Sequence, residues 1–204
     1  MLDVRRIRRA APMLSLEERL KHLGYDQRWL TFGFLDPDVL HAQHEACLSS
    51  RDSHTEHFRF ESFRRFLADR ASLSDVQLEQ YVELAVLDPD QSMAVSALAD
   101  LLIWPGLSPL QLEQLASHAA FEPPSLRGLV VRRRLLASIL AGRIDDALVA
   151  SCIATNHSAV QRAIIRANGI TGRQLDLLSR SGCNRAVRNL ATQCLLRRLN
   201  DSPN

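Results

Sequence analysis

Apolar residues recur with a helical period through the second half of the chain. The clearest case occupies positions i, i+3, i+4, i+7 and i+8 and consists of Val187, Leu190, Ala191, Cys194 and Leu195. Such spacing places the side chains on one stripe of a helix, here a helix over 185–199. The same spacing recurs one unit earlier in Val160, Ala163, Ile164 and Ala167. Breaks rich in Gly, Pro or polar residues separate these segments at about the length of ordinary helices, so the pattern predicts an all-α protein.

An internal repeat organises residues 73–199. The octamer that begins Leu73-Ser74 returns 34 positions later at Leu107-Ser108, and each copy has a Gln three residues after its Ser. A Ser followed by Gln at this distance predicts a capping box at a helix start, and Thr171 with Gln174 repeats the pairing. Further along, the step becomes 27: Gly142, Ile144, Leu148 and Val160 match Gly169, Thr171, Leu175 and Val187.

Each unit therefore holds two amphipathic helices that cannot bury their apolar faces alone. Stacked copies share a continuous core, which is the physical basis of a solenoid. An irregular helical bundle with recurrent capping chemistry is the alternative interpretation, because closed bundles and open stacks share local patterns.

Two short motifs in this region resemble those of the HEAT, armadillo and leucine-rich-repeat-variant families. They are the turn 87–90 (Leu-Asp-Pro-Asp) and Val187-Arg188-x-x-Ala191 in a second helix. The chain departs from that pattern where the step shortens and where Val160 is followed by Gln161 instead of Arg. The resemblance implies a right-handed α-solenoid, a stack of helical hairpins of the kind that usually binds macromolecules. It transfers no catalytic residue.

The N-terminal part predicts a helical cap over 14–70 within a single domain spanning 1–204. Ser15 with Glu18 forms a capping box, and Gly24 is placed to end that helix. An aromatic segment over 58–68 keeps a helical period, so we expect a helix there and not a strand. Residues 1–13 carry four Arg and are expected to be a disordered basic arm.

Composition indicates a protein of the cytoplasm. Hydrophobic residues make up 46% and charged residues 24% of the chain, which is ordinary for a globular protein. The four cysteines have no close pairs, which suits a reducing compartment. No secretory signal core and no membrane-spanning segment is evident. Export by a route without a cleavable signal stays open.

Charge divides the chain into two halves. Residues 123–204 contain 13 Arg and four acids, a net charge of +9, whereas residues 1–122 contain 12 basic and 19 acidic residues, a net charge of −7. Within the basic half, Arg133 is expected to point away from an apolar stripe that includes Val131 and Leu135. We predict a binding face formed by Arg127, Arg133, Arg134, Arg162, Arg166, Arg185 and Arg188.

A face of this kind attracts acidic macromolecules. The first interpretation is a non-enzymatic interaction protein with an acidic protein partner, and the second is binding of nucleic acid without regard to sequence. All 11 aromatic residues lie at or before Phe121, which lowers the expectation of single-strand stacking. The acidic half of a second copy is a further possible partner. A plain solvated surface is the alternative to all three.

A histidine cluster gives the only concentrated set of candidate ligands. His41, His44, His54 and His57 lie within 17 residues and suggest a divalent metal site, and with it a metal-dependent enzyme as the third functional class. Their spacing matches no familiar zinc signature. Neither a nucleophile elbow nor a phosphate-binding loop is present, so we expect no catalytic residue and no cofactor besides this possible metal.

Overall fold

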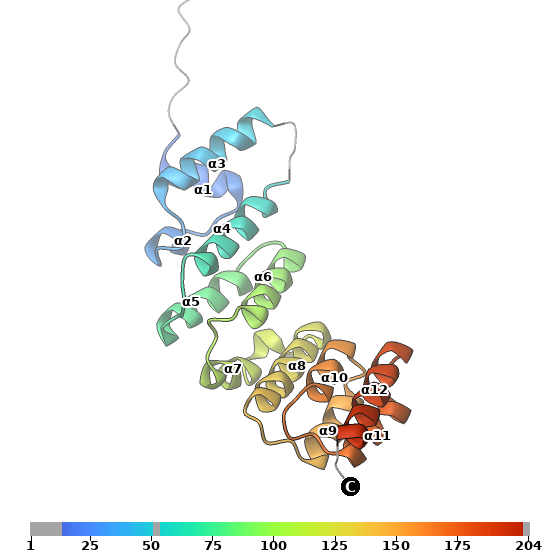
Figure 1. Ribbon diagram of the computed structural model, residues 1–204. Helices are drawn as coiled ribbons and strands as arrows, with labels where there is room; N and C mark the ends of the chain where they lie inside the picture. The colour runs from blue at the N-terminus through green and yellow to red at the C-terminus, as the bar shows by residue number, and fades with distance from the viewer. Residues whose placement is uncertain (1–13, 51–53, 202–204) are drawn as a thin grey trace, which may run out of the picture. The chain divides into compact units, whose positions relative to one another are not determined.

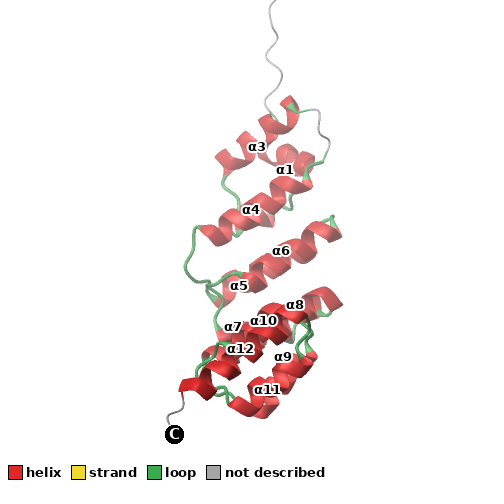
Figure 2. Ribbon diagram, turned by 45° about the vertical axis from the view of Figure 1, so that its right-hand side comes forward, coloured by secondary structure: helices red, strands yellow, loops and turns green. Residues whose placement is uncertain are grey.

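The computed structural model describes residues 14–50 and 54–201. Throughout these residues the regular structure is helical, as the sequence predicts, and Figure 2 shows helices joined by loops with no strand in the described part. No helix in the described ranges is long and apolar enough to cross a membrane. The predicted basic arm, 1–13, lies outside the described residues.

The chain divides into two compact units, Met1–Gly106 and Leu107–Asn204. The boundary follows Trp104-Pro105-Gly106 and separates the two copies of the 34-residue repeat. Whether both units form one domain stays a prediction.

Six helices, coloured blue to green in Figure 1, make up the described part of the first unit. They are α1 Leu16–Leu23, α2 Arg28–Thr31, α3 Pro37–Ser49, α4 Glu56–Ala68, α5 Asp75–Val86 and α6 Gln91–Ile103. Helix α1 packs on α3 and α4, and α6 packs on α4 and α5. The predicted aromatic helix is confirmed as α4, and its Phe63 ring lies 4.5 Å from Trp29 and 4.6 Å from Tyr81.

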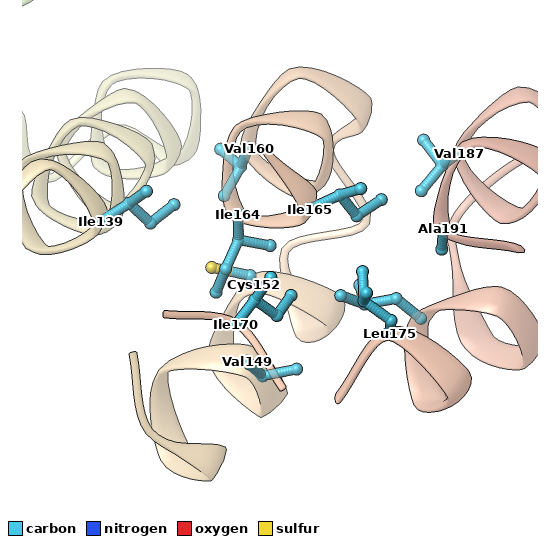
Figure 3. Packing of buried hydrophobic residues seen from close by; sticks show 11 residues of the cluster. Ile139, Val149, Cys152, Val160, Ile164, Ile165, Ile170, Leu175, Val187 and Ala191 are labelled. Atoms are coloured by element: carbon cyan, nitrogen blue, oxygen red, sulfur yellow. The ribbon is translucent and has the colours of Figure 1, made fainter. Parts of the chain in front are cut away.

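Six α-helices and one short 3-10 helix make up the described part of the second unit. They are α7 Pro109–Ala116, η1 Ala119–Phe121, α8 Pro124–Leu140, α9 Asp146–Ala154, α10 Ser158–Ile165, α11 Gly172–Ser181 and α12 Arg185–Asp201. The helices α8, α10 and α12 pack in succession, and α9 packs on α11. In Figure 3 the side chains of both sets point toward one another, and Val149, Cys152, Val160, Ile164 and Leu175 are fully buried there.

The predicted caps are confirmed. Ser15, Ser74, Ser108 and Thr171 each accept a hydrogen bond from the amide three residues on, and the Glu or Gln at that position reaches back to the cap amide. Gly24 ends α1 with a φ of 74°, a left-handed conformation that a side chain disfavours. Local capping chemistry therefore sets where these helices begin and end.

One register assignment from the sequence is wrong. Leu148 was matched to Leu175 at a step of 27, but Leu148 is only half-buried, and the buried Val149 is the equivalent of Leu175 at a step of 26. The N-caps Asp145 and Thr171 are also 26 apart. Helix α11 is one residue longer than α9, so the second helices α10 and α12 regain the step of 27.

Candidate functional site: arginine on the second helices

The second helices of the second unit carry its positive charge. Helices α8, α10 and α12 contain nine Arg and no acidic residue before Asp201, whereas α7 and α9 each contain one acid and no base, and α11 contains two Arg and one acid. Since α8 packs on α10 and α10 on α12, these three helices form a continuous row, hereafter the basic row. Most of the arginines of the second unit thus lie on its second helices, which is a finer division than the two halves seen in the sequence.

Helix α10 presents two of the predicted arginines at the centre of the basic row. Its buried positions include Val160 and Ile164, whereas Arg162 and Arg166 share the opposite, exposed side. Arg162 donates to the carbonyl oxygen of Ser158 at 3.3 Å and to its hydroxyl at 3.1 Å. Arg185, the first residue of α12, is also exposed.

The prediction for Arg133 is wrong. Arg133 is partly buried, while Val131, assigned to the apolar stripe, is 42% exposed. The reason lies in α8, which buries Leu126 and Val130 along its first half but turns Ile139 inward on another side. Arg133 stands seven positions after Leu126 and three after Val130, so at about 100° per residue it follows the first of these faces.

Arg134 and Arg127 line a groove beside α7. Arg134 Nε donates to Glu113 at 2.8 Å, and a second guanidinium nitrogen binds the other oxygen of that carboxylate. The groove has a volume of about 360 Å³ and also includes the apolar Phe121 and Val130. Because Glu113 neutralises Arg134, and Glu122 also lines the groove, this end of the row attracts anions less than α10 does.

Arg188 closes a helix end. Its Nη1 donates to the carbonyl oxygen of Gly182, the C-cap of α11, at 2.8 Å. Gln161, fully buried at the equivalent position of α10, donates to the carbonyl oxygens of Cys152 and Ile153 near the end of α9, both at 3.2 Å. Gln161 and Arg188 therefore occupy equivalent positions and each donate to carbonyl oxygens near the end of the preceding helix, α9 or α11.

The seven predicted arginines thus do not act as one set. Arg162, Arg166 and Arg185 are exposed on the basic row; Arg127 and Arg134 border the groove; Arg133 and Arg188 are partly buried. The sequence alone could not separate them because their partners come from other helices.

The four histidines of the metal hypothesis are not brought together. His54 is exposed beside Glu56, with 3.5 Å between Nδ1 and Oε1, and the His57 ring packs against Phe58. His44 is buried in α3, and its nearest ring is that of His22, at 5.0 Å. Across residues 14–50 and 54–201, no three His, Cys, Asp or Glu side chains are grouped so as to hold a metal ion.

His44 is the most unusual titratable group. It is 2% exposed, and within the described part of the chain neither ring nitrogen has a hydrogen-bond partner. Burial, followed by the nearby charges of His22 and Arg19, lowers the pKa of His44. Folding therefore favours the neutral form of this ring, and its contribution to stability is lost as the pH falls below the ordinary histidine pKa of about 6.5.

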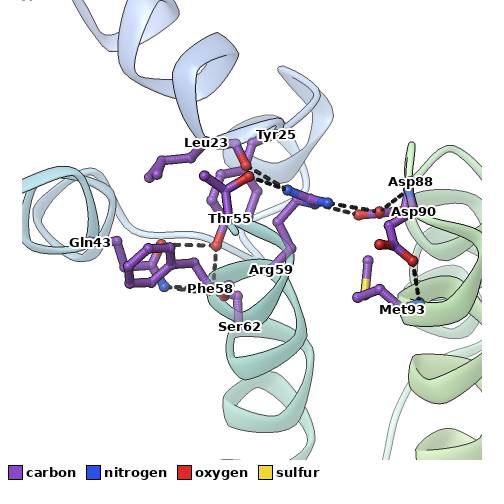
Figure 4. A network of polar contacts seen from close by, with 10 residues as sticks. All are labelled: Leu23, Tyr25, Gln43, Thr55, Phe58, Arg59, Ser62, Asp88, Asp90 and Met93. Carbon is purple, nitrogen blue, oxygen red and sulfur yellow. Dashed lines mark hydrogen bonds and ion pairs between the residues drawn. The ribbon is translucent and has the colours of Figure 1, made fainter. Parts of the chain in front are cut away.

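A buried polar network in the first unit was missed by the sequence reasoning (Figure 4). Arg59 of α4 is 3% exposed and donates to both carboxylate oxygens of Asp88, at 2.7 and 3.1 Å. Its Nη1 also donates to the carbonyl oxygen of Leu23 at 2.7 Å. Nearby, the Tyr25 hydroxyl donates to Gln43. The network ties α1, α4 and the α5–α6 turn together, so its role is structural.

Cys152 is a core residue of the second unit. Cys152 is fully buried, and burial raises the pKa of its thiol to about 11. At neutral pH this sulfur is a protonated, apolar core atom, as expected from its place in a helical stripe.

Comparisons with models of known protein families, with curated proteins and with solved structures found no match for this chain.

Proposed function

We propose that this protein is a non-enzymatic interaction module, a short helical-repeat solenoid that binds an acidic protein partner through the basic row. The observation that carries the proposal is the charge of the second helices, which have nine Arg and no acid before Asp201. Exposed guanidinium groups on adjacent helices raise the local concentration of anionic partners and accelerate their association.

The proposal includes a right-handed, HEAT-like or armadillo-like solenoid, and three observations support the stacking of helical hairpins within it. Equivalent capping boxes begin α5, α7 and α11. Second helices pack on second helices, and α9 packs on α11. Gln161 and Arg188 close equivalent helix ends. A cytoplasmic location belongs to the same proposal.

An acidic protein fits this row better than single-stranded nucleic acid does. No aromatic residue occurs in 123–204, and Phe121 is buried, so the row has no ring on which a base could stack. Binding of duplex nucleic acid needs no such ring, so an experiment must distinguish a duplex from an acidic protein as the partner.

The test compares a fluorescent Glu-rich peptide with random duplex DNA at an ionic strength of about 0.01 M, where charges reach about 30 Å. We expect the peptide to bind, and the double variant Arg162→Glu/Arg166→Glu to abolish most of that binding. The variant Arg173→Glu, on the exposed surface of α11, is the control for a change of charge away from the row.

Equal loss of binding in Arg173→Glu and in the double variant Arg162→Glu/Arg166→Glu would contradict a role for the row. Tight binding of DNA without binding of the peptide would show that the partner of the row is a nucleic-acid duplex and not an acidic protein. Low salt is the right condition because attraction to the phosphate backbone is strongest there. Affinity capture from native extract, with and without nuclease, then identifies the partner.

A further inference from the structure

Helix α5 presents an exposed surface that is the opposite of the basic row. It contains three acids and no base. Asp75, Val76, Glu79, Glu83 and Val86 are all exposed and, at about 100° per residue, occupy one side of the helix. The other side buries Leu78, Tyr81, Val82, Leu84 and Ala85. We refer to the exposed set as the acidic face of α5.

Aliphatic side chains accompany the carboxylates on this face. Val76 is 61% exposed and Val86 is 52% exposed, although both are residues that usually lie inside. Of the three carboxylates, Glu83 accepts a hydrogen bond from Arg28 at 2.6 Å. Glu79, midway along the helix, adds negative charge to the face, and within residues 14–50 and 54–201 no ion pair neutralises it.

The basic row has the complementary properties. It combines the exposed Arg162, Arg166 and Arg185 with apolar residues that solvent reaches, notably Leu140 of α8, at 87%, and Leu196 of α12, at 55%. Opposite charge sets the orientation of an encounter, and the apolar contact area supplies affinity.

We propose that the partner of the basic row is a second copy of this chain, which docks there through its acidic face of α5. This inference rests on the proposed function of the row. Residues 1–106 contain 17 acids and 12 bases, a formal charge of −5, whereas residues 107–204 contain 6 acids and 13 bases, a charge of +7. The first unit of one copy and the second unit of another therefore carry opposite net charges and attract each other.

A contact between two different surfaces of identical chains is heterologous. Each bound copy keeps one basic row or one acidic face for the next copy, so association continues or closes a ring. Since the attraction acts between exposed charges, it weakens when salt shortens the screening length from about 30 Å at 0.01 M to about 3 Å at 1 M.

Sedimentation velocity of the full chain tests the proposal. We expect the sedimentation coefficient of the wild type to rise with concentration at low salt and to become independent of concentration at high salt. Glu79→Arg and Arg162→Glu should each weaken self-association by about tenfold or more, the scale of one or two lost charge contacts. Asp69→Arg and Arg173→Glu are matched controls, because both positions are exposed and lie outside the two surfaces.

Mixing the two charge-reversed variants is the decisive step. The Glu79→Arg chain retains its basic row, and the Arg162→Glu chain retains its acidic face, so the mixture should associate although each variant alone does not. A mixture no more associated than its components overturns the proposal. So does a wild type that stays monomeric at low salt, or a control that weakens association as much as its matched variant.

The Glu-rich peptide distinguishes failure of this inference from failure of the proposed function. If the peptide binds and Arg162→Glu weakens it while the wild type remains monomeric, the second copy is not the partner, yet the row still binds acidic protein. If neither the peptide nor a second copy binds, both proposals fail.

Discussion

Removing one charge from the Arg59–Asp88 pair should destabilise the first unit severely. In Asp88→Asn the side chain keeps its shape, but one carboxylate oxygen facing the guanidinium becomes an NH2 group, so one of the two hydrogen bonds is replaced by a contact between donors. Arg59 is 3% exposed, hence its charge stays in the interior without a counter-ion. Breaking a buried pair in this way costs about 3–5 kcal/mol.

Tryptophan fluorescence measures this loss in the full chain. Both tryptophans, Trp29 and Trp104, belong to the first unit and are buried there, so their emission follows the unit that contains the pair. With an m value of about 2 kcal/mol/M, the urea midpoint should fall by about 1.5–2.5 M. High salt should change this difference little, because buried charges are poorly screened.

A double-mutant cycle separates the pair from general damage to the core. Arg59→Met alone leaves the Asp88 carboxylate buried, whereas the combination with Asp88→Asn leaves no buried charge at all. The double variant should therefore be more stable than the sum of the single losses predicts, by about 1–3 kcal/mol. A single Asp88→Asn loss below about 1 kcal/mol, or strictly additive losses, would refute the argument that the charges depend on each other.

Three further variants test local features. Gly24→Ala should lower the free energy of unfolding more than Gly33→Ala does. Both glycines have positive φ, but only at Gly24 would a Cβ meet Arg59 Nη1, at 2.7 Å. Urea midpoints that fall equally would contradict this steric argument. His44→Leu should reduce the fall in stability between about pH 7 and 5, since the lowered pKa of His44 makes the unfolded chain bind the proton first. An unchanged dependence of the urea midpoint on pH would rule this out. Gln161→Leu should cost about 1–3 kcal/mol, because it leaves the part-buried amide of Cys183 without the acceptor that Gln161 provides at 2.8 Å. Far-UV circular dichroism in urea measures this loss, and a loss below a few tenths of a kcal/mol would show that water replaces the side-chain amide.

Local chemistry was predictable from the sequence. Capping boxes such as Ser108 with Gln111 use partners three residues apart, so the residues that specify a helix start are adjacent in the chain. The same holds for the left-handed Gly24 and for the helical period of α4.

Features that depend on distant helices were not predictable. The partner of Arg134 comes from α7, and the inward side of α8 changes along its length, which misplaced Arg133. The Arg59 network was missed although a signal existed: Arg59 precedes Phe63 by four and Phe66 by seven positions, so a charged residue stands on a buried stripe. Such a charge indicates a buried counter-ion, and the acidic turn at Asp88 was available to supply it.

The equivalence of Gln161 and Arg188 has a consequence for how such repeats can vary in sequence. Two successive hairpins use an amide and a guanidinium to donate to carbonyl oxygens near the end of the first helix, so this position requires a hydrogen-bond donor and not one particular amino acid. Repeats that meet this requirement with different side chains can diverge in sequence while their architecture persists. In such a chain the hydrogen-bond donors and acceptors keep the repeat pattern after the amino-acid sequence has lost it.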